Sequence, residues 1–316
     1  MQQRYLGRTG LKVSRLGLGT LTWGRDTDEH EARDQLIAFT EAGGTLVDTA
    51  AGYGDGASEE LLGSMIGDVV ARDDIVIATK AGISRARGHR ETDASRGYLI
   101  STLDASLRRL GVDHVDLWQV HTWVDDTPLE ETLSALDFAV ASGRASYVGV
   151  SNYSGWQSAQ AATWQRAVPG RATLASNQVE YSLLNRKVES EVLPAAEALG
   201  LGVLPWSPLG RGVLTGKYRT GTPADSRAAS PHFTNFVGSY LDDRSARIVE
   251  AVARAAEGLD WSPLEVALTW VRDRPGVTAP IVGARTAAQL RGSLTVEDCE
   301  LPLQIVAALD DVSGES

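Results

Sequence analysis

The chain has 316 residues and a formal net charge of −11, with 43% hydrophobic residues, 22% charged residues and a pI near 5.0. That length suits one large barrel or two ordinary domains, and the negative charge argues against nucleic acid and anionic membranes as partners. The single cysteine, Cys299, excludes an internal disulfide and no Cys/His cluster has the spacing of metal ligands, so we expect a cytoplasmic protein without a bound metal.

The N-terminal segment predicts a small hairpin. Residues 4–6 and 12–14 flank the turn-rich stretch 7–10. The segment lacks the apolar region of a signal peptide, and no uncharged apolar run elsewhere is long enough to span a bilayer, so we expect a soluble protein.

From residue 15 onward one unit recurs, made of a short β-like run, a polar loop and a segment with helical periodicity. Eight β-like runs of this kind lie at residues 16–19, 46–48, 75–80, 115–121, 147–151, 174–178, 202–206 and 279–283. Two of the helical segments, 99–110 and 129–140, each place an apolar stripe on one face, and Pro128 suits a first helical turn.

Strands that alternate with helices at this spacing predict parallel pairing with right-handed crossovers. Eight such units favour a closed (β/α)8 TIM barrel, with residues 1–316 as a single domain and the hairpin within 1–14 capping the barrel. The alternative is an open doubly wound sheet, which is weakened because no GxGxxG follows an early strand.

One segment departs from the repeat. Residues 208–243 are rich in Gly, Pro, Ser and Arg, and loops of that length are usually functional or disordered, so we expect a cofactor or substrate loop here. Two helices are predicted between residues 244 and 272, the second starting near Ser262 and Pro263.

The most informative stretch is DTAAGYGDGASEELLG, at residues 48–63. Asp48 ends a β-like run and Tyr53 follows on a Gly-rich loop, which forms half of a proton-transfer site. Ser58 and the two acids after it predict a helix start, because a hydroxyl and negative charge suit exposed N–H groups. The alternative interpretation is a capped turn with a surface tyrosine.

The carboxyl ends of parallel barrel strands converge on one face. Polar and aromatic residues, with one glycine, mark these ends: Asp48, Lys80, His121, Ser151 with Asn152, Gln178, Trp206 and Gly283. Each alone can be a structural hydrogen-bonding residue, but so many in register favour a site.

The types of residue at these ends suit proton transfer to a carbonyl. Lys80 can be a Schiff-base nucleophile, but Asp48 ends the neighbouring strand, so an ion pair is favoured. A lysine close to a phenol is expected to lower the tyrosine pKa from about 10, which would make Tyr53 a proton donor. His121 is either a buried structural histidine or a group that orients a carbonyl. Such a site needs an external hydride source.

Several motifs together resemble the aldo-keto reductase family from residue 17 to residue 289. These are the stretch 48–63, Lys80, QVH at 119–121, GVSN at 149–152, NQVEYS at 177–182, SPLGRG at 207–212 with GKY at 216–218, and GAR at 283–285. The resemblance implies a catalytic tetrad of Asp48, Tyr53, Lys80 and His121, with Tyr53 as the general acid. It also implies NADP(H) bound extended across the barrel mouth.

The resemblance further implies the cofactor contacts. Ser151, Asn152 and Gln178 would hold the nicotinamide carboxamide, Trp206 would stack on its ring, and Arg285 would bind the 2′-phosphate. The full set of implied cofactor residues is Gly19, Thr20, Asp48, Ser151, Asn152, Gln178, Trp206, Ser207, Pro208, Leu209, Gly210, Gly212, Lys217, Gly283, Arg285, Gln289 and Ser293. Many relatives carry an acid and an asparagine where this chain has Gly292 and Ser293.

Aromatic residues are expected to line the substrate pocket beside Tyr53 and His121. The predicted ones are Trp23, Trp123, Phe233 and Phe236, which would favour an aldehyde or ketone with an apolar or aromatic body.

The sequence therefore predicts NADPH-dependent reduction of aldehydes or ketones to alcohols. Two alternatives remain: an NADPH-binding regulatory or sensor protein with little turnover, as some relatives are, and a Schiff-base lyase that uses Lys80. The oligomeric state stays open, with the monomer slightly favoured.

Overall fold

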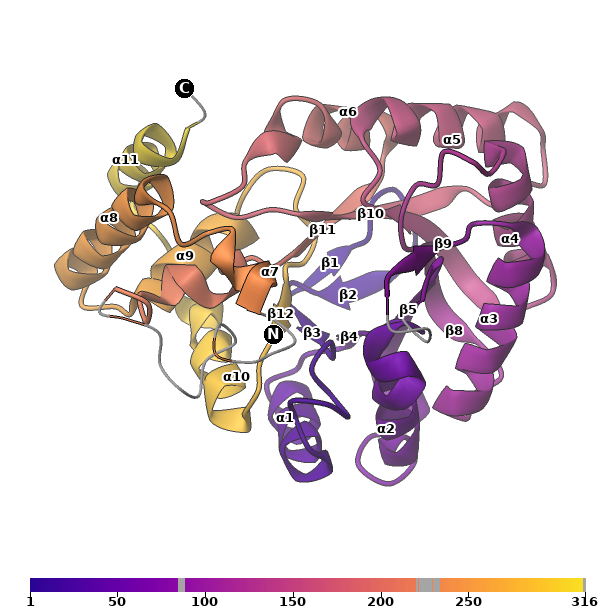
Figure 1. The fold of residues 1–316 in the computed structure, drawn as a ribbon, viewed down its shortest axis with the longest axis horizontal. Helices are drawn as coiled ribbons and strands as arrows, with labels where there is room; N and C mark the ends of the chain where they lie inside the picture. Colours follow the sequence, from indigo (N-terminus) through magenta and orange to yellow (C-terminus); the bar gives the residue numbers. More distant parts are fainter. Residues whose placement is uncertain (85–88, 220, 222–228, 230–233, 315–316) are drawn as a thin grey trace.

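The computed structural model describes residues 1–84, 89–219, 221, 229 and 234–314. Eight parallel strands close into a barrel, in which each strand pairs with the next in the chain and the last with the first (Figure 1). The barrel strands are β3 (Gly17–Gly19), β4 (Leu46–Asp48), β5 (Val76–Ala81), β8 (Val115–Val120), β9 (Ala145–Ser151), β10 (Leu174–Glu180), β11 (Gly202–Trp206) and β12 (Ile281–Gly283). The eight predicted β-like runs and the (β/α)8 barrel are thus confirmed, and the open sheet is wrong.

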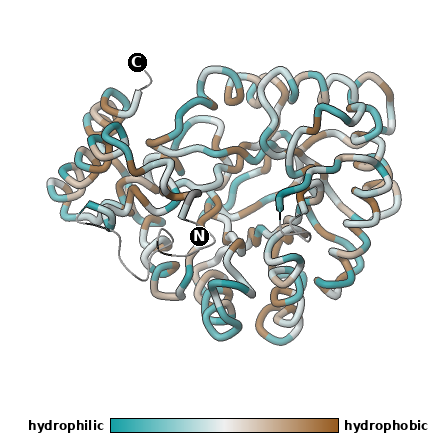
Figure 2. Tube along the Cα trace, in the orientation of Figure 1, coloured by the Kyte–Doolittle hydropathy of each residue, from teal (hydrophilic) through white to brown (hydrophobic). Residues whose placement is uncertain are grey.

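Helices surround the barrel, and their buried apolar residues form one core with the strands (Figures 1 and 2). These helices are α1 (Glu29–Glu41), α2 (Ala57–Met65), α3 (Arg96–Leu110), α4 (Leu129–Ala141), α5 (Gly155–Ala167), α6 (Val192–Leu199), α8 (Asp243–Leu259), α9 (Pro263–Arg272), α10 (Ala287–Leu294) and α11 (Leu303–Ser313). Helix α8 packs on α9, and α11 packs on α8. In α3 the predicted stripe faces the core, since Leu99, Leu103 and Leu110 are buried. The predicted helix start near Ser262 is also confirmed, because Ser262 caps α9 in a capping box with Glu265.

The N-terminal hairpin closes one end of the barrel. Strands β1 (Gln3–Tyr5) and β2 (Lys12–Ser14) pair antiparallel, and Leu6 and Val13 pack with barrel residues such as Leu117 in a separate interior cluster. Because this hydrophobic cluster fills the barrel interior, polar chemistry is left to the opposite face, at the carboxyl ends of the strands.

Two further segments lie at that carboxyl-terminal face. Strand β5 is followed by a short antiparallel hairpin of β6 (Ile83–Ser84) and β7 (Glu91–Thr92), which the sequence patterns did not predict. Strand β11 is followed by a 3-10 turn (Gly210–Thr215) and by α7 (Thr234–Gly238), which contact each other. The predicted loop 208–243 covers this region, but Phe233 lies outside the described residues.

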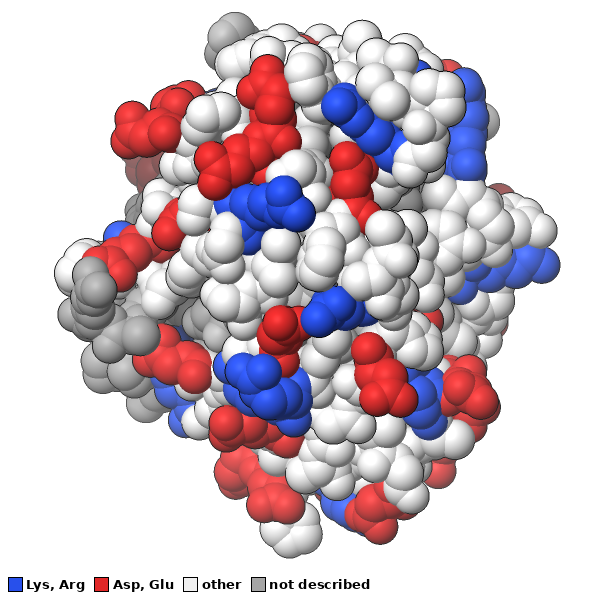
Figure 3. Space-filling model, turned by 90° about the vertical axis from the view of Figure 1, so that its right-hand side faces the viewer, with Lys and Arg blue, Asp and Glu red and all other residues white. Residues whose placement is uncertain are grey.

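None of the helices among the described residues combines the length and apolar character that crossing a bilayer requires. Acidic and basic side chains are interspersed over the face shown in Figure 3, which carries no extended patch of one sign.

Candidate active site

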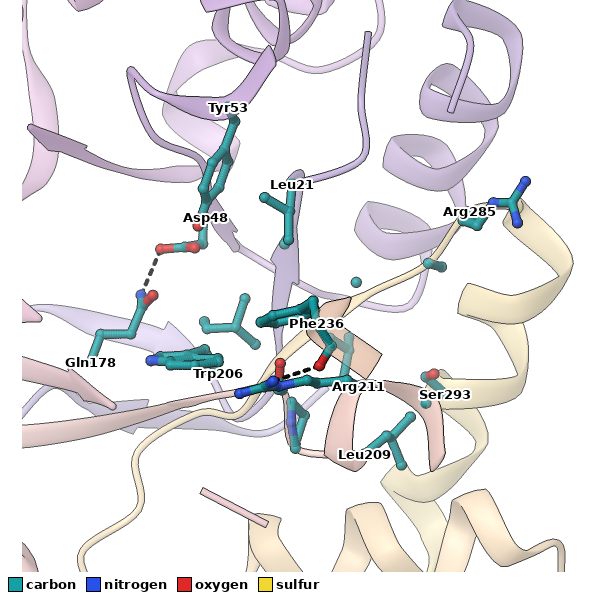
Figure 4. A pocket seen from close by; sticks show the side chains of 18 of the residues that line it. Leu21, Asp48, Tyr53, Gln178, Trp206, Leu209, Arg211, Phe236, Arg285 and Ser293 are labelled. Atoms are coloured by element: carbon teal, nitrogen blue, oxygen red, sulfur yellow. Dashed lines mark hydrogen bonds between the residues drawn. The ribbon is translucent and has the colours of Figure 1, made fainter. Parts of the chain in front are cut away.

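A cavity of about 590 Å³ opens at the carboxyl ends of the strands, and Figure 4 shows part of its lining. Most of the residues predicted for catalysis or cofactor binding line it. They are Gly19, Asp48, Tyr53, His121, Ser151, Asn152, Gln178, Trp206, Ser207, Pro208, Leu209, Gly212, Lys217, Gly283, Arg285, Gln289 and Ser293. The fold therefore gathers residues from all parts of the chain around one space.

An acid and a lysine form a buried ion pair beneath this cavity. The Lys80 ammonium donates to the Asp48 carboxylate at 2.7 Å and to the Thr49 carbonyl at 2.8 Å. The side chains of Lys80 and Asp48 are only 0% and 2% exposed. The predicted ion pair is confirmed, and a lysine so enclosed is poorly placed to attack a substrate as a Schiff-base nucleophile.

The phenol of Tyr53 lies next to that pair. The Lys80 nitrogen is 5.2 Å from the centre of the Tyr53 ring, and the rings of Tyr53 and His121 meet edge-on with their centres 5.9 Å apart. Tyr53 opens a 3-10 turn (Tyr53–Gly56) whose next three residues all have positive φ, which Gly54 and Gly56 adopt without strain. This tight turn brings the phenol back over the ends of the strands.

The expected pKa of Tyr53 is wrong in direction. Burial of the hydroxyl is the largest effect and raises the Tyr53 pKa; the Lys80 charge lowers it and the Asp48 charge raises it, so the net pKa is above the ordinary value. For Lys80, burial lowers the pKa, but Asp48 and Tyr53 outweigh it and the net pKa is raised. The site therefore holds a charged ammonium beside a protonated phenol, which is the form that can donate a proton.

Amide and hydroxyl side chains connect the strand ends across the cavity floor. Asn152 donates to the His121 carbonyl at 2.9 Å and accepts from the Trp206 indole at 3.0 Å. Gln178 donates to Asp48 at 2.8 Å, an interaction drawn in Figure 4. Asn152 has φ 60°, a conformation that costs energy for a residue with a side chain and that persists only where the surroundings hold it.

The predicted helix start after Tyr53 needs one correction. Helix α2 begins at Ala57 and is preceded by Gly56 in a left-handed conformation, so Ser58 is not its capping residue. The Ser58 hydroxyl is instead buried, within 2.7 Å of the Thr20 hydroxyl and 3.1 Å of the Thr49 hydroxyl. Thr20 therefore lies behind the cavity wall and joins the Tyr53 loop to the end of β3.

An arginine that sequence reasoning did not assign to the site organises the loop after β11. Arg211 forms a two-pronged ion pair with Glu180 at 2.8 and 2.9 Å, and its guanidinium lies 3.9 Å from the centre of the Phe236 ring. The Phe236 ring in turn stacks with Trp206, with centres 6.4 Å apart and planes 19° apart. The motif at 207–212 contains Arg211, but no sequence signal links it to Glu180, which lies 31 residues earlier.

Residues predicted for the far end of the cavity lie together. Arg285 lies just before α10 and Gln289 in its first turn, and the Gln289 side chain accepts from the Arg285 backbone at 3.0 Å. Ser293 lines the same end, one further turn along α10. Gly210 is buried just behind the lining, where it contacts Leu184.

Two predicted substrate residues lie elsewhere. Trp23 is fully buried in the core and donates to Gln35 at 3.1 Å, so the prediction that it lines the pocket is wrong. Trp123 packs edge-on against Tyr153 and Trp156 outside the cavity.

The lining of the cavity instead includes three residues that were not predicted: Leu21, Ile83 and Arg90. The direction of a side chain on an irregular loop follows no fixed period along the sequence. The presence of aromatic residues on the loops therefore did not predict which of them line the cavity.

The chemistry of the lining fits a phosphorylated dinucleotide. The described lining residues include five cations, Arg25, Arg90, Arg211, Lys217 and Arg285, and one acid, Asp48, although the whole chain is acidic. Ser, Asn and Gln side chains lie near Trp206, where an amide-bearing aromatic ring finds hydrogen-bonding partners, and Arg285 can bind a phosphate bidentately at the opposite end.

The fold and the site define a class: a (β/α)8 barrel with an acid, a lysine, a phenol and a histidine around one cavity at its carboxyl-terminal face. A model of the "Aldo/keto reductase family" matches residues 15–313, and the chain belongs to that family. The resemblance inferred from the sequence is thus confirmed.

Relatives with different names are similarly close. The chain is 38% identical over 326 aligned positions to "Uncharacterized oxidoreductase YrpG" of Bacillus subtilis, which covers 99% of this chain and 96% of the relative. It is 36% identical to "Probable voltage-gated potassium channel subunit beta" of Oryza sativa subsp. japonica, over 99% of this chain and 96% of the relative. It is 35% identical to "L-glyceraldehyde 3-phosphate reductase" of Escherichia coli, over 92% of this chain and 86% of the relative.

Proposed function

We propose that this protein reduces aldehydes or ketones to alcohols with NADPH. The single observation that carries the proposal is the buried Asp48–Lys80 pair beside the Tyr53 phenol and the His121 ring, at the floor of a cavity of about 590 Å³. Membership of the aldo/keto reductase family supports it.

The protein's residues divide the work as follows. His121 orients the carbonyl oxygen of the substrate, and Tyr53 gives its proton to that oxygen as negative charge develops there. Lys80 then stabilises the phenolate that remains, and Asp48 keeps the ammonium in place. When bound, the reduced nicotinamide supplies the hydride that the protein lacks.

The cofactor contacts are part of the same proposal. Ser151, Asn152 and Gln178 would hold the carboxamide beside Trp206, and Arg285 would bind the 2′-phosphate. The glycines of the segment after β11 allow close backbone approach to the pyrophosphate, and Lys217 adds a positive charge there. Gln289 and Ser293 would face the adenosine.

The test is the loss of NADPH absorbance with a panel of aromatic and aliphatic carbonyls, including L-glyceraldehyde 3-phosphate because one relative is named for it. Tyr53→Phe should lower kcat by at least ~100-fold, the usual contribution of a positioned acid. Tyr5→Phe is the matched control, because Tyr5 lies in the hairpin at the opposite end of the barrel and is 57% exposed. Equal turnover by wild type and Tyr53→Phe would refute the assigned proton donor.

A regulatory role is the second candidate, favoured by the 36% identity to a probable potassium channel subunit beta. It predicts tight NADPH binding without turnover of any carbonyl in the panel. Failure to bind NADPH at all would refute both functions.

We infer in addition that residues 1–316 act as one domain in the cytoplasm, on a small-molecule substrate and without a nucleic acid or membrane partner. The unpaired state of Cys299 is consistent with a reducing compartment. Light scattering would decide the oligomeric state, for which the monomer is slightly favoured.

A further inference from the structure

The hairpin of β6 and β7, which packs against the Tyr53 loop, brings a cation to the cavity. Arg90 is an exposed residue that lines the cavity, immediately before β7. The hairpin of β6 and β7 holds it there. A Cβ on Gly52, the neighbour of Tyr53, would lie 2.7 Å from the Ile83 carbonyl, so the hairpin lies directly against the loop of the phenol. The same chain segment joins His121, whose backbone N–H donates to the Ala81 carbonyl at 2.8 Å.

The other cations of the lining have different roles. Arg211 is paired with Glu180 at 2.8 Å, and Arg25 is paired with Asp26 at 3.0 Å. Lys217 lies in the segment after β11, and Arg285 lies at the end of the cavity away from Tyr53, as Figure 4 shows for Arg285. Arg90 is thus the lining cation carried by the hairpin that packs against the Tyr53 loop.

Within the described ranges Arg90 forms no ion pair or hydrogen bond. In the same hairpin, the Glu91 carboxylate lies 3.1 Å from the Nε2 atom of His89. The one acid among the described lining residues, Asp48, is neutralised by Lys80 beneath the cavity floor. A negative charge that enters the cavity beside this hairpin therefore meets a guanidinium that has no hydrogen-bond acceptor among the described residues.

We propose that Arg90 selects carbonyl compounds that bear a carboxylate or a phosphate, so that the substrate of this protein is an anionic aldehyde or ketone; this rests on the proposed reductase function. A guanidinium binds either anion with two parallel N–H bonds. Because the whole chain has a net charge of −11, its overall field disfavours anions, and a local cation is needed to bind one. Leu21 and Ile83 supply the apolar contacts for the body of the substrate between the anion and the carbonyl.

The test compares matched substrates with and without an anionic group. One pair is 4-carboxybenzaldehyde and methyl 4-formylbenzoate, and the other is glycolaldehyde phosphate and glycolaldehyde; together they separate carboxylate from phosphate recognition. The readout is the ratio of kcat/KM for the anionic and the neutral member, measured for wild type, Arg90→Ala and Arg90→Lys. Arg108→Ala is the matched control, because Arg108 is exposed on α3 and does not line the cavity.

We expect wild type to prefer the anionic member of at least one pair. Arg90→Ala should lower the ratio for that pair about tenfold, mainly through KM, which corresponds to the loss of a charge-assisted hydrogen bond. Arg90→Lys should keep part of the preference, since it keeps the charge but not the two-pronged geometry. Added salt should reduce the wild-type ratio, and Arg108→Ala should leave it unchanged.

Three results would overturn the proposal. Wild type that prefers the neutral member of both pairs has no anion site at Arg90. A loss of the same size for both members in Arg90→Ala would mean that Arg90 supports the hairpin rather than binding the substrate. Absence of turnover with all four compounds and with the wider carbonyl panel would refute the reductase function itself, and this inference with it.

Discussion

The ammonium of Lys80 lies 2.7 Å from the carboxylate of Asp48, and both side chains are shielded from solvent under the phenol of Tyr53. The pair comes from adjacent parallel strands, β4 and β5, so the barrel itself sets the distance. A charge enclosed in this way depends on its partner, because burial makes an unpaired charge costly.

Lys80→Met is therefore expected to lower stability as well as activity. It leaves Asp48 buried without its counter-ion, which costs about 3–5 kcal/mol of unfolding free energy. Urea denaturation at neutral pH measures this. The control is Arg33→Met, which breaks the Arg33–Asp68 ion pair, whose side chains are 44% and 64% exposed. Exposed pairs contribute about 0–1 kcal/mol, so a loss of equal size in both variants would contradict the view that Lys80 compensates a buried charge.

The raised pKa of Tyr53 predicts the pH dependence of carbonyl reduction. The donor must be protonated, and burial keeps it so through neutral pH, so kcat should stay level until the pH exceeds about 10, the ordinary tyrosine value, and then fall. The measurement is kcat against pH at saturating substrate. A fall centred near neutral pH would mean that the Lys80 charge outweighs burial and that the Tyr53 pKa is lowered after all.

The same pKa shift has a consequence for stability. A group with a raised folded-state pKa contributes stability below its unfolded pKa, and that contribution is lost as pH rises through the folded value. For Tyr53 the pH range over which this stability is lost therefore begins near pH 10. Unfolding measured from pH 8 upward should show a smaller alkaline loss in Tyr53→Phe than in wild type, beyond what other tyrosines contribute to both.

Arg285→Ala should reduce the preference for NADPH over NADH. Removal of a bidentate guanidinium–phosphate contact is expected to lower the NADPH/NADH affinity ratio by roughly 10- to 100-fold, with NADH binding little affected. Arg291→Ala on α10, the helix that follows Arg285, is the control, since Arg291 is exposed and does not line the cavity. An unchanged NADPH/NADH affinity ratio in Arg285→Ala would show that Arg285 does not bind the 2′-phosphate.

Arg211→Lys tests whether the arginine holds the loop after β11 in place. Lysine cannot form the two-pronged pair with Glu180 or stack on Phe236, so we expect the Kd for NADPH to rise about tenfold, mainly through faster dissociation. Arg219→Lys is the control, because its ion pair with Glu250 is about half exposed. Unaltered dissociation in Arg211→Lys would show that the loop does not depend on this pair.

Much of the fold and of the candidate site could be predicted from the sequence, because the relevant signals are local. Apolar runs and helical stripes mark the barrel strands and helices, and the parallel arrangement brings the strand-end residues Asp48, Lys80 and His121 to one face without further information. The pairing of Asp48 with Lys80 follows from the order of neighbouring strands.

The tertiary structure decided what depends on depth and on contacts between distant segments. Burial raises the Tyr53 pKa although the charge of Lys80 lowers it. The geometry of the loop places Leu21 in the cavity lining and buries Trp23 in the core. Arg211 forms its ion pair with Glu180, a residue of a different segment. Desolvation and side-chain direction on irregular loops have no period along the chain, so only the packed molecule determines them.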